Sequence, residues 1–171
     1  MRTYLRFIMI LILVSVSACQ PWDEHSFPVN LSSAGNIFTG SFSINRGDIY
    51  SFNIGYACDC SGDAPRIFSF YNLIRGDDAP EKRVKPVIVF KVTRNGRSYI
   101  SDTFELQAPG SIMYIDADEN PDKDVNVNFT PFAWADLPVG EYEFELEVVR
   151  GDLRLRDIRS FLVIFFSSPK V

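Results

Sequence analysis

Residues 140–149 read GEYEFELEVV, and this alternation constrains the fold more than any other stretch of the chain. Successive side chains of a β-strand point to opposite faces, so the pattern predicts a strand with one buried face and one solvated face. We expect the glutamates to keep the protein soluble and to protect a sheet edge. The apolar residues are Tyr142, Phe144, Leu146 and Val148, and the glutamates are Glu141, Glu143, Glu145 and Glu147.

The same period of two recurs along much of the chain. Apolar side chains share one face of residues 37–44 and of residues 49–56, while residues 86–93 and 160–166 are nearly continuous apolar runs typical of central strands. An Asn-Gly pair at Asn95 lies between two such segments and predicts a tight hairpin. No window shows sustained helical periodicity. Together these segments predict an all-β protein, an antiparallel immunoglobulin-like β-sandwich of about 7–9 strands.

A turn precedes the glutamate-rich strand. Pro138 and Gly140 form it, and Tyr142 opens the strand that follows. In Greek-key sandwiches a tyrosine at this position often bonds back across the corner. We therefore expect Tyr142 to be structural.

The N-terminal residues have the pattern of an export signal. Arg2 and Arg6 precede an apolar run of eight residues, 7–14, which is shorter than the roughly 20 residues that a spanning helix needs. The small residues before Cys19 and the cysteine itself resemble the lipobox of bacterial lipoproteins. This resemblance implies that the Cys19 thiol carries diacylglycerol, that the chain is cut before it, and that the new amine is acylated. A plain signal peptide with a chance cysteine is the alternative. Gln20 after the cysteine implies sorting to the outer membrane, facing the periplasm.

These features divide the chain into three parts. We expect a signal peptide at 1–18, a lipidated tether at 19–36 and a β-sandwich domain at 37–171. Removing the two signal-peptide arginines changes the formal net charge from −5 to −7. An acidic surface repels phosphate backbones, so nucleic acid is excluded as a partner. The membrane contact is expected through the lipid on Cys19 rather than through a basic face.

The densest acidic segment is a candidate calcium loop. Alternate oxygen-bearing side chains along a curved loop can supply the ligands that calcium prefers. Pro121 stands where an EF-hand loop needs glycine, and Val127 replaces the bidentate glutamate. We therefore favour a solvated acidic connection and expect no cofactor. The candidate ligands are Asp116, Asp118, Asn120, Asp122 and Asp124.

Two cysteines remain once Cys19 is lipidated. Cys58 and Cys60 are two positions apart, and in an oxidising periplasm we expect them to form a local disulfide. A straight strand would strain that bridge, but Ser61 and Gly62 permit a turn. A zinc site would need further ligands, and redox catalysis would need a different cysteine spacing.

Catalysis is not expected. The chain has one histidine, His25, in the predicted tether, so a hydrolase triad has no imidazole within the folded domain. We expect the domain instead to bind a protein partner with a basic surface. Aromatic residues near the acidic segment are candidate anchors, because such side chains dominate interface hot spots. They are Phe129, Phe132 and Trp134.

Several segments together resemble a family of proteobacterial lipoproteins with a β-sandwich body. They are AGNIFTGSFSI, YSFNIGY, PVIVFKVTRNG and LPVGEYEFELEVV, within residues 31–166. The resemblance implies an envelope lipoprotein. One version is similar to small lipoproteins that neutralise a type VI secretion effector, which makes an immunity-type role the first hypothesis. An accessory role in envelope assembly is the second, and an enzyme acting on glycan or lipid is the third.

Overall fold

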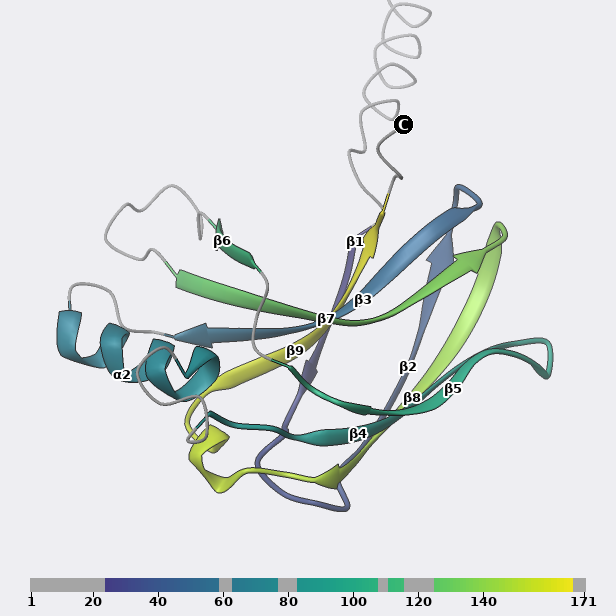
Figure 1. Ribbon diagram of the computed structural model, residues 1–171. Helices are drawn as coiled ribbons and strands as arrows, with labels where there is room; N and C mark the ends of the chain where they lie inside the picture. Colours follow the sequence, from purple (N-terminus) through teal and green to yellow (C-terminus); the bar gives the residue numbers. More distant parts are fainter. Residues whose placement is uncertain (1–23, 59–62, 77–82, 108–110, 116–124, 168–171) are drawn as a thin grey trace, which may run out of the picture.

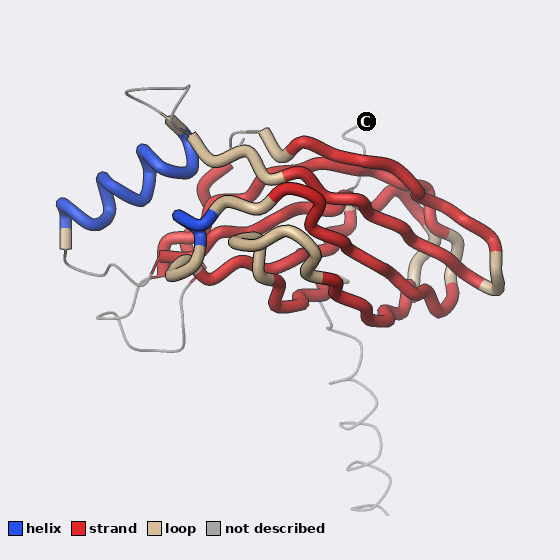
Figure 2. Tube along the Cα trace, turned by 90° about the horizontal axis from the view of Figure 1, so that it is seen from below, coloured by secondary structure: helices blue, strands red, loops and turns tan. Residues whose placement is uncertain are grey.

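The computed structural model describes residues 24–58, 63–76, 83–107, 111–115 and 125–167. These residues form two antiparallel sheets packed face to face, with helix α2 at one end (Figures 1 and 2). The five-stranded sheet has the order β1 (Glu24–Val29), β9 (Arg159–Phe166), β3 (Asp48–Cys58), β7 (Val125–Leu137) and β6 (Ser111–Ile115). The four-stranded sheet has the order β2 (Ile37–Ile44), β8 (Gly140–Arg150), β4 (Val87–Arg94) and β5 (Arg97–Glu105). The predicted antiparallel β-sandwich is therefore confirmed.

The first strand corrects the predicted tether. Residues 24–29 pair along their whole length with β9, so the sandwich begins at Glu24 rather than at residue 37. Leu31, also within the predicted tether, is 1% exposed in the core. One face of this edge strand is solvated, so the segment carries polar residues. That polarity led to the prediction of a flexible linker.

Helix α2 (Ala64–Arg75) was not expected from the sequence. The Asp63 carboxylate caps it by accepting the Arg66 amide at 3.1 Å, and Pro65 occupies its first turn. Gly76 ends it in the left-handed conformation. Phe70 and Ile74, four residues apart, are buried against the core. The caps were visible in the sequence, but the apolar stripe is too narrow to show a helical period.

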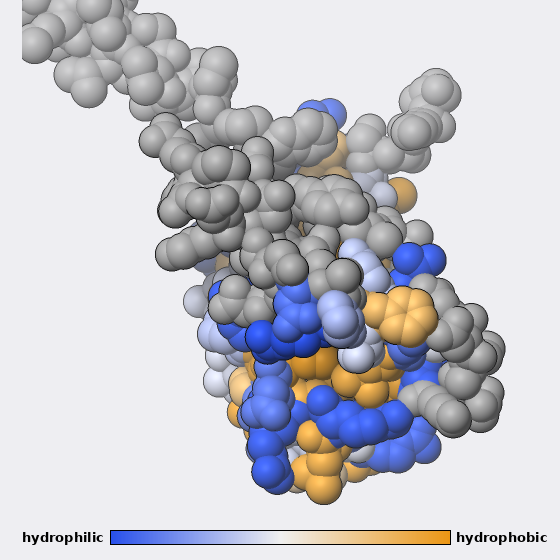
Figure 3. Space-filling model, turned by 90° about the vertical axis from the view of Figure 1, so that its left-hand side faces the viewer, coloured by the Kyte–Doolittle hydropathy of each residue, from blue (hydrophilic) through white to orange (hydrophobic). Residues whose placement is uncertain are grey.

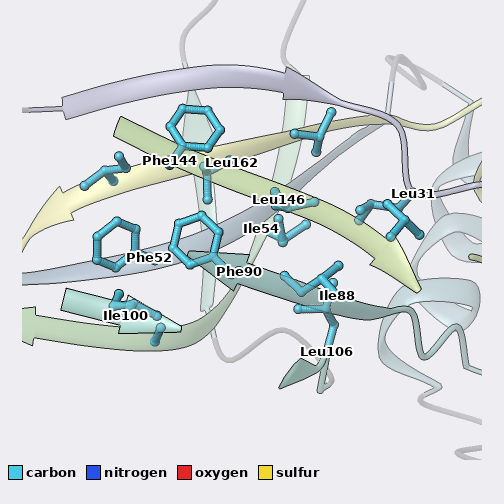
Figure 4. Packing of buried hydrophobic residues seen from close by; sticks show 14 of the residues in the cluster. Leu31, Phe52, Ile54, Ile88, Phe90, Ile100, Leu106, Phe144, Leu146 and Leu162 are labelled. Carbon is cyan, nitrogen blue, oxygen red and sulfur yellow. The ribbon is translucent and has the colours of Figure 1, made fainter. Parts of the chain in front are cut away.

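The core lies between the sheets (Figure 4). Phe52 of β3 and Phe90 of β4 are fully buried, and their ring centroids are 5.2 Å apart across the interface. Gly40 makes room for a third ring, since a Cβ there would lie 2.5 Å from the Phe144 ring. That ring then packs at 4.7 Å on Phe27 of β1. Aromatic pairs of this kind add to the hydrophobic free energy of burial.

Two of the predicted turns are confirmed. Asn95 and Gly96 both have positive φ, 51° and 76°, which is the geometry of a type I′ hairpin joining β4 to β5. The Tyr142 hydroxyl donates a hydrogen bond to the Pro138 carbonyl oxygen at 2.6 Å. Tyr50 makes an equivalent bond to the Arg46 carbonyl oxygen at 2.9 Å. Both tyrosines tie a turn between the two sheets to the strand that follows it.

The sandwich has two distinct ends (Figure 2). We call the end with the turns at 45–47, 95–96 and 138–139 the turn end. We call the opposite end, with α2 and the short 3-10 helix η3 (Leu153–Leu155), the helix end. No helix in the described part of the chain has the length and apolar character needed to cross a bilayer.

Candidate functional site

The glutamate ladder lies in the middle of the four-stranded sheet. Strand β8 pairs with β2 on one side and with β4 on the other, so its glutamates do not protect a sheet edge as expected. They project instead from the centre of the outer face of this sheet, since the alternate residues of β8 are buried in the core. This placement gives the domain a broad, solvated acidic surface.

Hydroxyl side chains on β2 flank the glutamates of β8. The register places Ser43, Ser41 and Thr39 opposite Glu141, Glu143 and Glu145 respectively. The Ser43 hydroxyl donates to the Glu141 carboxylate at 2.8 Å. The result is a grid of hydroxyls and carboxylates, because cross-strand neighbours lie about 5 Å apart.

A single lysine faces this grid from β4. The Lys91 ammonium donates to the Glu145 carboxylate at 2.6 Å, and this hydrogen bond, with the attraction of the same carboxylate, raises the pKa of Lys91. Glu143 lies between Ser41 and Thr93, and it has no hydrogen-bond or ion-pair partner among the described residues. The surface therefore keeps an unneutralised carboxylate at its centre.

Two adjoining hollows cross this face. One has a volume of about 450 Å³ and the other about 410 Å³, and both are lined by Ser41, Thr93 and Glu143. The first extends toward Lys91 and Glu145, and the second toward the β4–β5 hairpin. We call the two together the glutamate groove. Its polar lining suits extended, charged side chains better than an apolar ligand.

A third hollow lies at the helix end. It has a volume of about 400 Å³ between α2 and the ends of β3 and β9, with an apolar floor that includes Phe70, Leu73 and Ile158. Arg66 and Asp157 stand among its lining residues. Figure 3 shows hydrophobic residues in the centre of this face, framed by hydrophilic ones.

Polar atoms are also buried without partners near this end. Asn128 and Ser160 flank Tyr56 in one cross-strand row on the core-facing side of the five-stranded sheet. The Asn128 amide, 0% exposed, and the Ser160 hydroxyl accept and donate no hydrogen bond within the described chain. An unpaired buried amide costs on the order of 1–3 kcal/mol.

The three predicted anchor residues do not lie on one exposed surface. Phe129 is 2% exposed and packs on Phe161 and Phe165 over the outer face of the five-stranded sheet, so it is not available to a partner. Phe132 is partly buried between the sheets against Phe90. Trp134 is exposed, at 57%, and its role as an anchor stays a prediction.

His25 belongs to the fold rather than to a tether. Its Nε2 donates to the Ser43 carbonyl oxygen at 2.9 Å, and its ring lies 5.7 Å from that of Phe42. Because β1 and β2 are edge strands of different sheets, this bond closes one side of the sandwich. His25 lies at the sandwich edge and is not among the residues that line the glutamate groove.

Several predicted residues lie outside the described residues. These are Cys19, Cys60 and the candidate calcium ligands Asp116, Asp118, Asn120, Asp122 and Asp124. Cys58 is at the end of β3 and is 9% exposed, and its disulfide with Cys60 stays a prediction. No group of three metal-ligating side chains occurs within the described ranges.

The sequence predicted the two strands that form the glutamate groove but not that they pair with each other. Both sides of it carry a period-two signal, Thr39, Ser41 and Ser43 on β2 and the glutamates on β8. Pairing between two segments about 100 positions apart leaves no local trace, so nothing in the sequence joined them.

Comparison with known proteins bears on the fold alone. No protein-family model matches the sequence, and no curated protein matches it. A crystal structure of a protein from Sulfurospirillum deleyianum matches with a TM-score of 0.66 and 12% identity, over 86% of this chain and 99% of that one. At this identity the likeness shows a shared β-sandwich fold and carries no information on function.

Proposed function

We propose that the protein is an envelope lipoprotein, anchored through acyl chains on Cys19, that binds a basic protein partner and performs no chemistry. The anchor holds it at the outer membrane, facing the periplasm. The partner is a secreted effector that the lipoprotein neutralises in the producing cell, which makes its role that of an immunity protein.

The glutamate groove supports a basic partner. Four glutamates share this face with two cations, Lys91 and, at the β4–β5 hairpin, Arg94, so the surface carries excess negative charge even after the ion pair between Lys91 and Glu145. Such a surface speeds the encounter with a basic protein, and the gain falls as salt screens the charges.

The strongest support for this proposal is the position of Glu143. It lies in both hollows of the groove and is flanked by the hydroxyls of Ser41 and Thr93, yet it has no partner among the described residues. An arginine or lysine of the partner can pair with its carboxylate while the hydroxyls accept the remaining N–H groups. Charge-assisted bonds of this kind are about twice as strong as neutral ones.

The position of His25 supports a non-catalytic role. One ring nitrogen donates a hydrogen bond to the Ser43 carbonyl oxygen, and the ring packs against those of Phe27 and Phe42. A general base must reach the proton that it removes, and this imidazole is held at the sandwich edge instead.

A photo-crosslinking experiment in the producing cell tests the proposal. A photoreactive amino acid in place of Ser41 lies in the groove, and we expect it to capture one defined basic protein from the envelope. The same amino acid in place of Asp136, exposed on the five-stranded sheet, is the control and should not capture it.

Binding of the purified partner then gives the decisive measurement. We expect Glu143→Lys to weaken binding at least about tenfold and to flatten its dependence on salt, whereas Asp136→Lys changes neither. Equal binding by wild type and Glu143→Lys would overturn the assignment of the groove. Turnover of a glycan or phospholipid by the purified protein would overturn the non-catalytic role.

A further inference from the structure

Three arginines at the turn end lie over aromatic rings. The guanidinium carbon of Arg46 lies 4.9 Å from the Phe166 ring centroid, and that of Arg94 lies 5.6 Å from the Tyr142 ring centroid. The third, Arg97, lies 5.1 Å from the Tyr99 ring centroid. Arg94 also packs against Gly140 and lines the second hollow of the glutamate groove. Arg46 and Arg97 are therefore the two whose N–H groups are available to an anion.

Among the described residues, none of these arginines forms an ion pair with a carboxylate. Every ion pair given by the described residues uses other cations, namely Arg66, Lys91, Arg150 and Arg154. Asp48 and Asp136 bring negative charge to the same end. The Asp48 carboxylate accepts a hydrogen bond from the Ile49 backbone amide. The turn end is therefore mixed in charge, and its binding capacity resides in the guanidinium edges rather than in net charge.

Apolar side chains stand exposed beside the arginines. Val139, at the tip of the β7–β8 turn, is 55% exposed, and Ile49 at the start of β3 is 38% exposed. The turns are close together, since a Cβ on Gly47 would lie 3.5 Å from the Pro138 Cα. The turn end thus combines planar cations with protruding apolar tips, which is the composition of surfaces that lie at a lipid headgroup layer.

The chain also enters the sandwich at this end. Glu24, the first residue of β1, is paired with Phe165, and the next residue of β9, Phe166, is paired with Tyr50 beside the turn at 45–47. Cys19 is five positions before Glu24. At about 3.4 Å per residue, Cys19 cannot be farther than roughly 17 Å from the start of β1.

We propose that the turn end faces the membrane and that Arg46 and Arg97 bind the phosphate groups of anionic phospholipids. This orientation rests on the lipid anchor of the proposed function. It directs α2 and the hollow at the helix end away from the bilayer, and it leaves the glutamate groove on the side of an upright sandwich. The anchor and the arginines then act together, since the anchor raises the local concentration of headgroups around each guanidinium.

Fluorescence quenching by brominated phospholipids tests the orientation. The full acylated protein, carrying Trp22→Phe and Trp134→Phe, receives one tryptophan at Val139→Trp or, as the matched control, at Leu153→Trp, a 65% exposed position at the helix end. In vesicles of phosphatidylglycerol we expect at least about twofold quenching at position 139 and none at position 153. Phosphatidylcholine vesicles, and the change Arg46→Glu with Arg97→Glu, should each remove most of it.

A second charge reversal distinguishes phosphate binding by these arginines from a general effect of net charge. Arg66→Glu on α2 together with Arg156→Glu at the end of η3 makes the same change in net charge at the other end and should leave the quenching intact. Quenching at position 153 equal to that at 139, or quenching indifferent to lipid charge, would overturn the proposal. The intact mass reports acylation independently, and an unacylated product would overturn it as well, while binding of a partner to the glutamate groove would be unaffected.

Discussion

The Tyr142 hydroxyl donates to the Pro138 carbonyl oxygen at 2.6 Å, across the turn that carries the chain from β7 in one sheet to β8 in the other. The ring is 1% exposed and stacks on Phe42 at 5.5 Å. One side chain thus fixes the turn and fills the core.

Removing this hydroxyl should weaken the sandwich. We expect Tyr142→Phe to lower the free energy of unfolding by about 1 kcal/mol, because a turn hydrogen bond is lost while the ring remains. Urea unfolding measures it. Tyr50→Phe removes the equivalent bond to Arg46 and should cost a similar amount. A double mutant with strictly additive losses would show that the two turns, although adjacent, are independent.

A methyl group at Gly40 should disrupt the packing of β1 and β2 on β8. We expect Gly40→Ala to cost about 1–3 kcal/mol, because its Cβ would meet the Phe144 ring. Ser41→Ala, on the solvated face of the same strand, is the control and should cost little. Thermal melts compare the two, and equal melting temperatures would contradict the packing argument.

The stability of the protein should fall at alkaline pH. Burial raises the pKa of the Tyr56 phenol and is also the largest cause that raises the pKa of Tyr142. The folded chain therefore holds these protons more tightly than the unfolded chain, whose tyrosines titrate near pH 10. Stability should be complete below about pH 10 and be lost as the pH rises toward the folded pKa values.

Chemical unfolding at about pH 8 and about pH 11 checks this dependence. Tyr56→Phe, which has no proton to lose, should show a shallower decline than wild type. Parallel declines would mean that the Tyr56 phenol does not contribute.

Lipidation should depend on Cys19. Cys19→Ala removes the thiol that the lipobox presents, so the variant should take up no labelled palmitate and should accumulate as precursor or soluble protein. Metabolic labelling measures the incorporation. Persistent label in the variant would show that the signal is of the plain secretory kind.

Cys58 and Cys60 should be oxidised in exported protein. The peptide that contains them is expected to be lighter by two hydrogens under non-reducing conditions, and Cys58→Ser should abolish the difference. Mass spectrometry with and without a reductant measures it. Alkylation of both thiols without reduction would contradict the prediction.

The sequence by itself determined the strands and the turns between some of them. The alternation of Tyr142 with Glu143 shows which side chains of β8 are buried, because a strand has a period of two whatever it pairs with. The Asn95 turn is equally local, since its backbone conformation depends on residues within the turn.

Only the tertiary structure decided which strands are neighbours. The chain changes sheets after most strands, so β2 lies beside β8 although the hydrogen-bonded Ser43 and Glu141 are 98 positions apart. The same long-range pairing moved the glutamates from an edge to the centre of a sheet and brought His25 into the edge of the sandwich. Local periodicity contains no register between distant segments, because that register is set by the packing of both faces at once.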